Sequence, residues 1–269
     1  MLRLAWMTDP HLNFLDIDTR KEFCSSINNL KVDALLISGD IGEAVGIESY
    51  LRTLMENVEP PVYFVLGNHD YYRGSIADVR SRAARVCAES KRLIWLPQAG
   101  LIQITPDACL IGHDGWADGR FGNFLGSKVM LNDYRLIEEL KGLTSAERLE
   151  KLHYLGDEAA EHFMKLLPRA VQKYKQVIVL THVPPFREAC WHEGEISNDD
   201  YLPHFSCKAV GEVLRKAMVG VEAQMLVLCG HSHSPGEARI LPNLLVKTGK
   251  AVYGNPAVNE IITVPFDLA

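Results

Sequence analysis

Side chains able to bind metal or move protons follow apolar stretches of the sequence. Five apolar runs of strand length, at 2–7, 33–38, 62–66, 176–181 and 224–229, lead into Asp9 and His11, into Asp40, into Asn68, His69 and Asp70, into His182, and into His231 and His233. Five of the ten histidines occupy these positions. In open α/β sheets, residues just past the carboxyl ends of the strands meet at one ligand site. We therefore expect a common site.

With His69 and its neighbour Asp70 set aside, the group offers two aspartates, four histidines and one asparagine as ligands. Hard oxygen and borderline nitrogen ligands of this kind suit Mn, Fe, Ni, Co or Zn. Seven ligands are too many for one catalytic ion with open positions, and they suit two ions that share a carboxylate. Two such ions can hold a hydroxide between them and clamp the attacking and leaving oxygens of a displacement at phosphorus.

The elements that must position these residues form an α/β pattern. Segments with helical character lie between the apolar runs at 19–30, 46–58 and 75–90, and a further short run follows at 109–112. Continuous apolar strands alternating with helices predict a sheet covered on both faces. From Glu237 to Ala269, Gly, Pro and short β-like runs predict added strands, at the sheet edge or in a second sheet. No linker divides the chain, so we expect a single domain over 1–269.

The composition is that of a globular protein, because 47% of the 269 residues are hydrophobic and 23% are charged. The net charge of −6 disfavours nucleic-acid binding through bulk electrostatics. The six cysteines are scattered without a C-x-x-C pair, which favours reduced thiols. The N-terminus reaches Asp9 too soon for a signal peptide and no apolar run approaches the length of a membrane span, so we expect a cytoplasmic protein without membrane association.

The polar motifs occur in a specific order: DPH (9–11), GD (39–40), GNHD (67–70), TH (181–182) and GHSH (230–233). In this order the chain resembles the calcineurin-like metallophosphoesterase superfamily, from near its first residue to Ser234. The resemblance implies a four-layer α/β/β/α sandwich of two mixed β-sheets flanked by helices. It also implies a phosphoesterase that uses two divalent metal ions (Mn, Fe, Zn, Ni or Co).

The resemblance also assigns roles. It implies that the first ion is bound by Asp9, His11, Asp40 and His233, and the second by Asp40, Asn68, His182 and His231. A hydroxide between the ions would attack the phosphorus of a phosphomonoester or phosphodiester. His69 would face the substrate, where a protonated imidazole stabilises charge or protonates the leaving oxygen, and Asp70 would hold its ring. The alternative for Asp70 is a solvated loop carboxylate.

Two further segments are candidates for substrate contact. The Gly-rich stretch 111–124 carries His113 and Arg120, and the planar guanidinium of Arg120 suits bidentate phosphate binding. The alternative there is a surface loop with a structural Trp116. The irregular segment 184–207 follows His182 and would cap the substrate; its candidate contacts are Trp191, His192, Tyr201 and His204, each of which could instead be packed or solvated.

The motifs of this chain differ from those of some branches of the superfamily. Protein phosphatases read G-D-x-V-D-R-G and G-N-H-E, whereas this chain has GDIGEA and GNHD, so it does not resemble a Ser/Thr protein phosphatase. We expect a small-molecule phosphate ester as substrate. Two alternatives remain, a non-catalytic protein-binding scaffold on the same fold, like the retromer subunit, and a nuclease. His69 argues against the first and the acidic net charge against the second.

Overall fold

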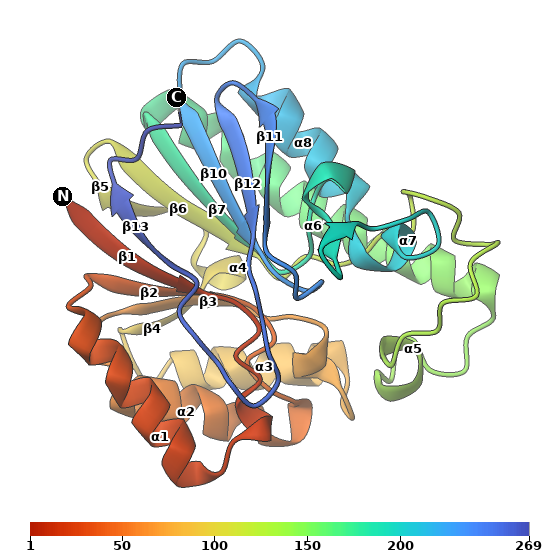
Figure 1. Ribbon diagram of the computed structural model, residues 1–269, viewed down its shortest axis with the longest axis horizontal. Helices are drawn as coiled ribbons and strands as arrows, with labels where there is room; N and C mark the ends of the chain where they lie inside the picture. Colours follow the sequence, from red (N-terminus) through yellow and green to blue (C-terminus); the bar gives the residue numbers. More distant parts are fainter. Residues whose placement is uncertain (269) are drawn as a thin grey trace.

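Two mixed β-sheets packed face to face form the centre of the molecule (Figure 1). The computed structural model describes residues 1–268. In the first sheet the order is β13-β1-β2-β3-β4, with bounds β1 (Leu2–Met7), β2 (Ala34–Ser38), β3 (Val62–Val65), β4 (Leu93–Trp95) and β13 (Glu260–Val264). In the second the order is β11-β12-β10-β7-β6-β5, with bounds β5 (Ile102–Thr105), β6 (Ala108–His113), β7 (Gln176–Thr181), β10 (Gln224–Cys229), β11 (Gly236–Leu241) and β12 (Leu244–Thr248).

Helices cover the outer face of each sheet (Figure 1). The first sheet is covered by α1 (Ile17–Ser26), α2 (Ile47–Asn57) and α3 (Ile76–Cys87), and the second by α6 (Ser145–Lys173) and α8 (Lys208–Met218). The connections hold the short helices α4 (Leu96–Ala99), α5 (Asp133–Leu136) and α7 (Leu202–Phe205), the hairpin β8 (Trp191–His192) and β9 (Glu195–Ile196), and the 3-10 turns η1 (Leu12–Phe14), η2 (Ile27–Leu30), η3 (Ala44–Gly46), η4 (His69–Tyr71) and η5 (Arg187–Ala189). The predicted four-layer α/β/β/α sandwich is confirmed.

Side-chain alternation along the strands explains why the apolar runs are continuous. In β2, Leu35 and Ile37 pack towards the helices, whereas Leu36 lies in the core between the sheets. In β10, Val227 packs towards α6 and α8, whereas Leu228 faces the first sheet. Because both faces of each sheet are buried, both sets of alternating side chains are apolar.

The C-terminal strands join both sheets. β11 and β12 extend the second sheet, and β13 pairs antiparallel with β1, with Leu2 opposite Val264. The prediction of added strands in this stretch is confirmed, although its last residue, Ala269, lies outside the described residues. The predicted helix at 19–30 is divided into α1 and the 3-10 turn η2. Over residues 1–268, no helix is both long and apolar enough to cross a membrane.

The carboxyl ends of β1, β2 and β3 in one sheet and of β7 and β10 in the other meet at a common edge. Each group of strands is parallel. Backbone hydrogen bonds connect the loops that follow, from Asp9 N to Gly39 O (3.1 Å) and from Gly230 N to His182 O (2.8 Å). Loops that are distant in sequence therefore converge at the seam between the sheets.

Candidate metal centre

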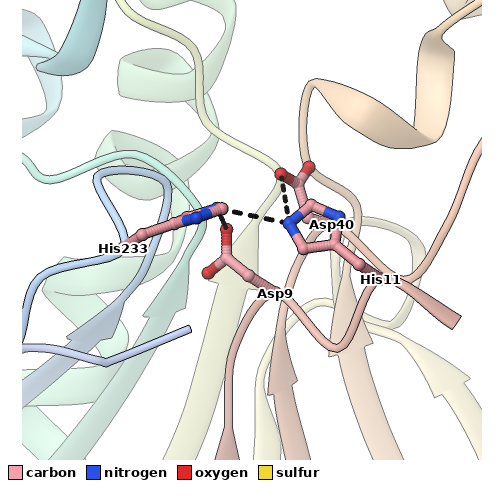
Figure 2. A group of neighbouring side chains, drawn as sticks. All are labelled: Asp9, His11, Asp40 and His233. Carbon is pink, nitrogen blue, oxygen red and sulfur yellow. Dashed lines mark hydrogen bonds and ion pairs between the residues drawn. The ribbon is translucent and has the colours of Figure 1, made fainter. Parts of the chain in front are cut away.

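The first group of ligands lies at this seam. Nitrogen and carboxylate oxygen atoms of Asp9, His11, Asp40 and His233 lie within 4.8 Å of one another (Figure 2). His233 Nε2 is 3.2 Å from His11 Nε2 and 3.3 Å from Asp9 Oδ1. All but His233 are buried, so these donor atoms form a compact group that is largely withdrawn from water.

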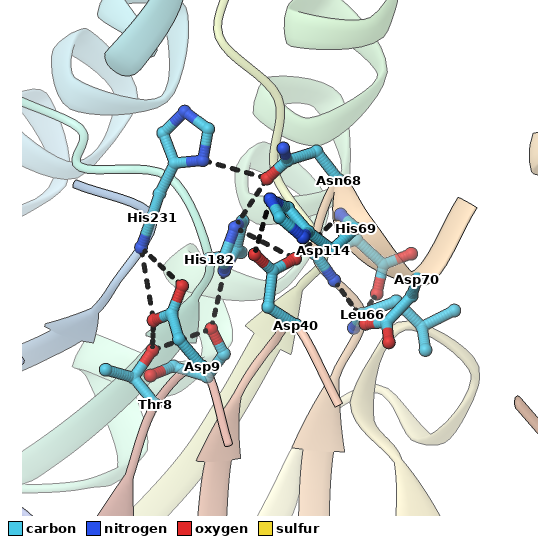
Figure 3. Close-up of polar contacts among 12 residues, drawn as sticks. Thr8, Asp9, Asp40, Leu66, Asn68, His69, Asp70, Asp114, His182 and His231 are labelled. Atoms are coloured by element: carbon cyan, nitrogen blue, oxygen red, sulfur yellow. Dashed lines mark hydrogen bonds and ion pairs between the residues drawn. The ribbon is translucent and has the colours of Figure 1, made fainter. Parts of the chain in front are cut away.

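A second group surrounds the side-chain oxygen of Asn68. Asn68 Oδ1 lies 2.9 Å from His182 Nε2 and 2.8 Å from His231 Nδ1 (Figure 3). The other nitrogen of each ring faces a backbone carbonyl, Ser38 O for His182 (2.9 Å) and His204 O for His231 (3.1 Å). A carbonyl oxygen can only accept, so those nitrogens carry the ring protons.

The atoms that face Asn68 Oδ1 are therefore lone pairs, provided that the rings are neutral. Burial lowers the pKa of His182 to about 3 and also lowers that of His231, so both rings are neutral near pH 7. Three lone-pair atoms then converge with no proton between them, an arrangement that is repulsive unless a cation lies among them. These residues fit a metal ion.

Asp40 lies between the two groups. Its Oδ1 is 3.4 Å from His182 Nε2, and its Oδ2 is 3.9 Å from His11 Nε2. Burial, together with the charges of Asp9 and Asp70, raises the pKa of Asp40 well above its ordinary value. A buried carboxylate without a counter-charge is costly, and a cation on either side would offset that cost.

The backbone of the ligand loops has unusual dihedral angles. Five of the expected ligands have positive φ: Asp9 (49°), His11 (42°), Asp40 (54°), His231 (70°) and His233 (60°). Residues other than glycine seldom adopt this conformation, and it gathers at functional sites where the surrounding structure enforces it. The turns thus hold the ligand side chains in place by a strained backbone conformation. A role in packing alone does not explain this strain.

His69 lies beside both groups. Its backbone N–H donates to Asp40 Oδ1 (2.9 Å), and its Nε2 is 4.0 Å from Asp40 Oδ2. Burial, with His11 nearby, lowers the pKa of His69 to about 2. The ring is therefore neutral near pH 7, which differs from the protonated imidazole expected from the sequence.

Asp70 is fully buried beneath the same turn. Its carboxylate accepts hydrogen bonds from the backbone N–H groups of Gly42 and Gly67, both at 2.8 Å. These contacts differ from both expectations, a partner for the ring of His69 and a solvated loop carboxylate. Asp70 instead fixes the backbone of the two loops that carry Asp40 and Asn68.

A cavity of about 330 Å³ opens beside the metal centre. Its walls are aromatic and polar and consist of Asn68, His69, Tyr72, Leu131, Asn132, Asp133, His192, Phe205, His231, Ser232, His233 and Tyr253. No lysine or arginine is among these lining residues. Tyr253 reaches the cavity from the loop between β12 and β13, and its ring centroid is 4.5 Å from that of His11 and 5.0 Å from that of His233.

The segment 184–207 borders this cavity through His192 and Phe205. The ring of Tyr201 lies 5.3 Å from that of His192. The indole of Trp191 packs against Gly236, and the buried His204 contacts the hydroxyl of Tyr134 through Nδ1. Of the four candidate contacts named from the sequence, the structure places only His192 on the cavity wall.

His113 and Arg120 lie elsewhere, and their predicted substrate contacts are not supported. His113 is opposite Thr181 in the β6–β7 ladder, but its ring packs against His162 and Phe163 of α6, on the outer face of the sheet. The guanidinium of Arg120 is paired with Asp118 and Asp157. Side-chain alternation along β6 points the ring of His113 towards the helices and away from the seam between the sheets.

Sequence reasoning missed three residues at the site. Asp133 and Tyr253 lie well past the ends of the strands before them, β6 and β12, so the rule that found residues directly after a strand does not apply. Tyr72 lies three residues after His69 and stacks on it. Its only sequence signal is its place next to GNHD.

Comparison with known proteins agrees with this geometry. The family model for calcineurin-like phosphoesterases matches residues 2–235, and the chain belongs to this family. It is a metal-dependent phosphoesterase, in agreement with its cluster of ligands. A comparison with curated proteins found no match.

Solved structures share the fold at low sequence identity. A phosphopantetheinyl hydrolase (PptH) from Mycobacterium tuberculosis has a TM-score of 0.67 at 16% identity, over 93% of this chain and 89% of the other. A dimetal phosphatase from Danio rerio has a TM-score of 0.58 at 14% identity, over 95% and 89%. TT1561 of Thermus thermophilus has a TM-score of 0.57 at 15% identity, over 93% and 89%.

Proposed function

We propose that the protein hydrolyses a small phosphomonoester or phosphodiester with two divalent ions, drawn from Mn, Fe, Zn, Ni and Co. One ion would be held by Asp9, His11, Asp40 and His233, and the other by Asp40, Asn68, His182 and His231. The observation that carries this proposal is the position of Asp40, whose two oxygens face the two separate groups of donors. When bound, such ions supply positive charge to the phosphoryl oxygens and make a nearby water a stronger nucleophile.

The residues of the chain supply the remaining functions. His69 is a neutral hydrogen-bond donor at the cavity wall, where its ring N–H can donate to the leaving oxygen. Tyr72 holds the orientation of that ring by stacking. Phe205 and Tyr253 exclude water from one side of the reacting group.

The cavity supports a small ester as substrate. A volume of about 330 Å³ holds a compact molecule, and the walls bring no lysine or arginine to pair with a second phosphate or a nucleic-acid backbone. The buried carboxylate of Asp133 on the same wall would disfavour an anionic leaving group. A planar or apolar leaving group would instead contact the aromatic walls.

The test is hydrolysis by the protein loaded with manganese. We expect turnover of para-nitrophenyl phosphate or its bis ester, and a loss of at least about 100-fold in Asp40→Asn, because even outer-shell changes at metal sites cost roughly 10- to 100-fold. Asp157→Asn, an exposed aspartate on α6, is the matched control and should retain activity. Absence of turnover with both esters, or full activity of Asp40→Asn, would contradict the proposal. Binding of a protein without turnover would favour the scaffold, and cleavage of single-stranded DNA alone would favour a nuclease.

A further inference from the structure

The carboxylate of Asp133 contacts a predicted metal ligand, Asn68, from outside the five sequence motifs. Asp133 is the first residue of α5, in the connection between β6 and α6, and is 4% exposed. Its Oδ1 accepts hydrogen bonds from Asn68 Nδ2 (2.9 Å) and from the hydroxyl of Tyr72 (2.7 Å). A carboxylate oxygen can only accept, so the amide nitrogen of Asn68 must face Asp133.

This contact, together with a longer one from Asn68 Nδ2 to the Tyr72 hydroxyl (3.3 Å), sets which way the amide of Asn68 points. With Nδ2 held by Asp133, Oδ1 lies against His182 Nε2 and His231 Nδ1. If the amide turned over, its NH₂ group would donate to both ring nitrogens and satisfy their lone pairs without a cation. Local hydrogen bonding therefore favours the reversed amide, and that orientation would exclude a metal ion.

Tyr134, the residue after Asp133, supports His231, another predicted ligand of the second ion. The hydroxyl of Tyr134 contacts His204 Nδ1, and His204 O accepts the proton on His231 Nε2 (3.1 Å). This leaves His231 Nδ1 as the free donor atom. Two adjacent residues of α5 thus support Asn68 and His231 by separate routes.

The connection is itself tied to the turn that carries Asn68. Arg73 N donates to Leu136 O (2.9 Å), and Glu138 N donates to Gly74 O (3.1 Å). These backbone bonds tie the connection to the turn, so the backbone of Asp133 is held beside Asn68.

We propose that Asp133 is a positioning residue that holds the amide of Asn68 with its oxygen towards the second metal ion and prevents the reversed, metal-excluding orientation. The inference rests on the proposed two-ion function. It concerns the second ion alone, because Asp133 contacts none of Asp9, His11 and His233. A general loss of structure would not produce such a selective effect.

The test is a calorimetric titration of metal-free protein with Mn²⁺, followed by metal analysis. Asn68→Ala identifies the binding step of the second ion. We expect Asp133→Leu, which removes the acceptor, to weaken that step by roughly 10- to 100-fold and to leave the other step unchanged. Asp133→Asn retains an acceptor oxygen and is the matched control, with an affinity close to that of the wild type. Should Asp133→Leu fail to fold, Asp133→Ser makes the same comparison because its hydroxyl is too short to reach the amide.

The outcomes separate this inference from the proposed function. If the wild type binds two ions and Asp133→Leu binds both with unchanged affinity, the positioning role is overturned and the two-ion function stands. Equal weakening of both steps in Asp133→Leu, or failure of Asp133→Asn to restore the second step, would also overturn it. If the wild type itself binds fewer than two ions, the proposed function fails first.

Discussion

The imidazole of His69 lies against the ring of Tyr72, with the centroids 4.2 Å apart and 28° between the planes. Tyr72 is in turn fixed by the hydrogen bond from its hydroxyl to Asp133. The carboxylate of Asp70 bonds to backbone N–H groups and does not hold the ring of His69. Stacking on Tyr72 therefore orients that ring. Tyr72, from the same turn, therefore orients the ring that would face the leaving oxygen in the proposed reaction.

Replacing His69 by alanine should separate catalysis from metal binding. We expect His69→Ala to lower kcat/KM by roughly 10²- to 10³-fold, the usual cost of removing one preorganised hydrogen-bond donor from an active site. Its ring is not in the group of ligands formed by Asp9, His11, Asp40 and His233, so the metal content should not change. Loss of an ion from the purified variant, measured by metal analysis, would show that His69 binds metal instead.

Tyr253 should contribute to substrate binding through its ring. The side chain is 48% exposed and lies over His11 and His233 at the edge of the cavity. We expect Tyr253→Ala to raise KM for nitrophenyl esters by roughly 2- to 10-fold, since an aromatic contact contributes about 0.5–1.5 kcal/mol. Tyr253→Phe keeps the ring and should leave KM within about twofold of the wild type. Equal effects of the two variants would assign the contribution to the hydroxyl.

Gly230 allows the loop after β10 to approach the loop after β1. A Cβ atom at this position would collide with the carboxylate of Asp9 and the side chain of Thr8. We expect Gly230→Ala to displace Asp9 and to weaken binding of the first ion by at least about 10-fold, with roughly 1–3 kcal/mol of lost stability. Titration with Mn²⁺ and urea unfolding measure the two effects. If this variant bound Mn²⁺ with the affinity of the wild type, the loops could separate without displacing Asp9, and the prediction would be wrong.

His113 should make the fold sensitive to acid. Burial, with His162 and Arg80 nearby, lowers the pKa of His113 from 6.5 to about 3. Above pH 6.5 the ring is neutral in both states and the full stability is present. As the pH falls from 6.5 towards 3, the unfolded chain takes up the proton first, so the free energy of unfolding decreases.

The variant that tests this is His113→Asn, whose side-chain oxygen can accept the hydrogen bond that Gly115 N gives to His113 Nδ1 (3.1 Å). We expect it to lose less stability than the wild type between pH 6.5 and 4, by an amount on the order of a few kcal/mol at the acid end. Urea unfolding at a series of pH values measures the difference. Parallel curves for the two proteins would rule out His113 as a source of acid sensitivity.

The sequence predicted β1, β2, β3, β6, β7 and β10 and the residues at their carboxyl ends, because both depend on local pattern, whereas the short strands β4 and β5 were not predicted. A buried strand requires a continuous apolar run, and the position just after it is fixed by chain connectivity. Asp9, Asp40, Asn68 and His182 were found in this way. The same rule gave a misleading result for His113, because the end of a strand does not determine the face towards which its last side chain points.

The residues that orient the ligands could not be predicted in this way. Asp133 reaches Asn68 only because the connection between β6 and α6 folds back onto the turn after β3. That path depends on tertiary contacts, as does the placement of Tyr253 over His11. Which buried polar side chains pair with one another depends on their proximity in the folded structure. A single sequence contains no local pattern that reveals this proximity.

Ions bound at the seam between the sheets would also have a mechanical role. The loops of the first sheet carry Asp9, His11, Asp40 and Asn68, whereas those of the second carry His182, His231 and His233. Bound ions would cross-link two halves of the core that otherwise adhere through apolar contacts. Ligand binding to the native state alone adds about 2.7 kcal/mol of stability at a concentration 100 times the Kd. Here the added free energy of unfolding would oppose separation of the two sheets, so the catalytic centre would also hold the two halves of the core together.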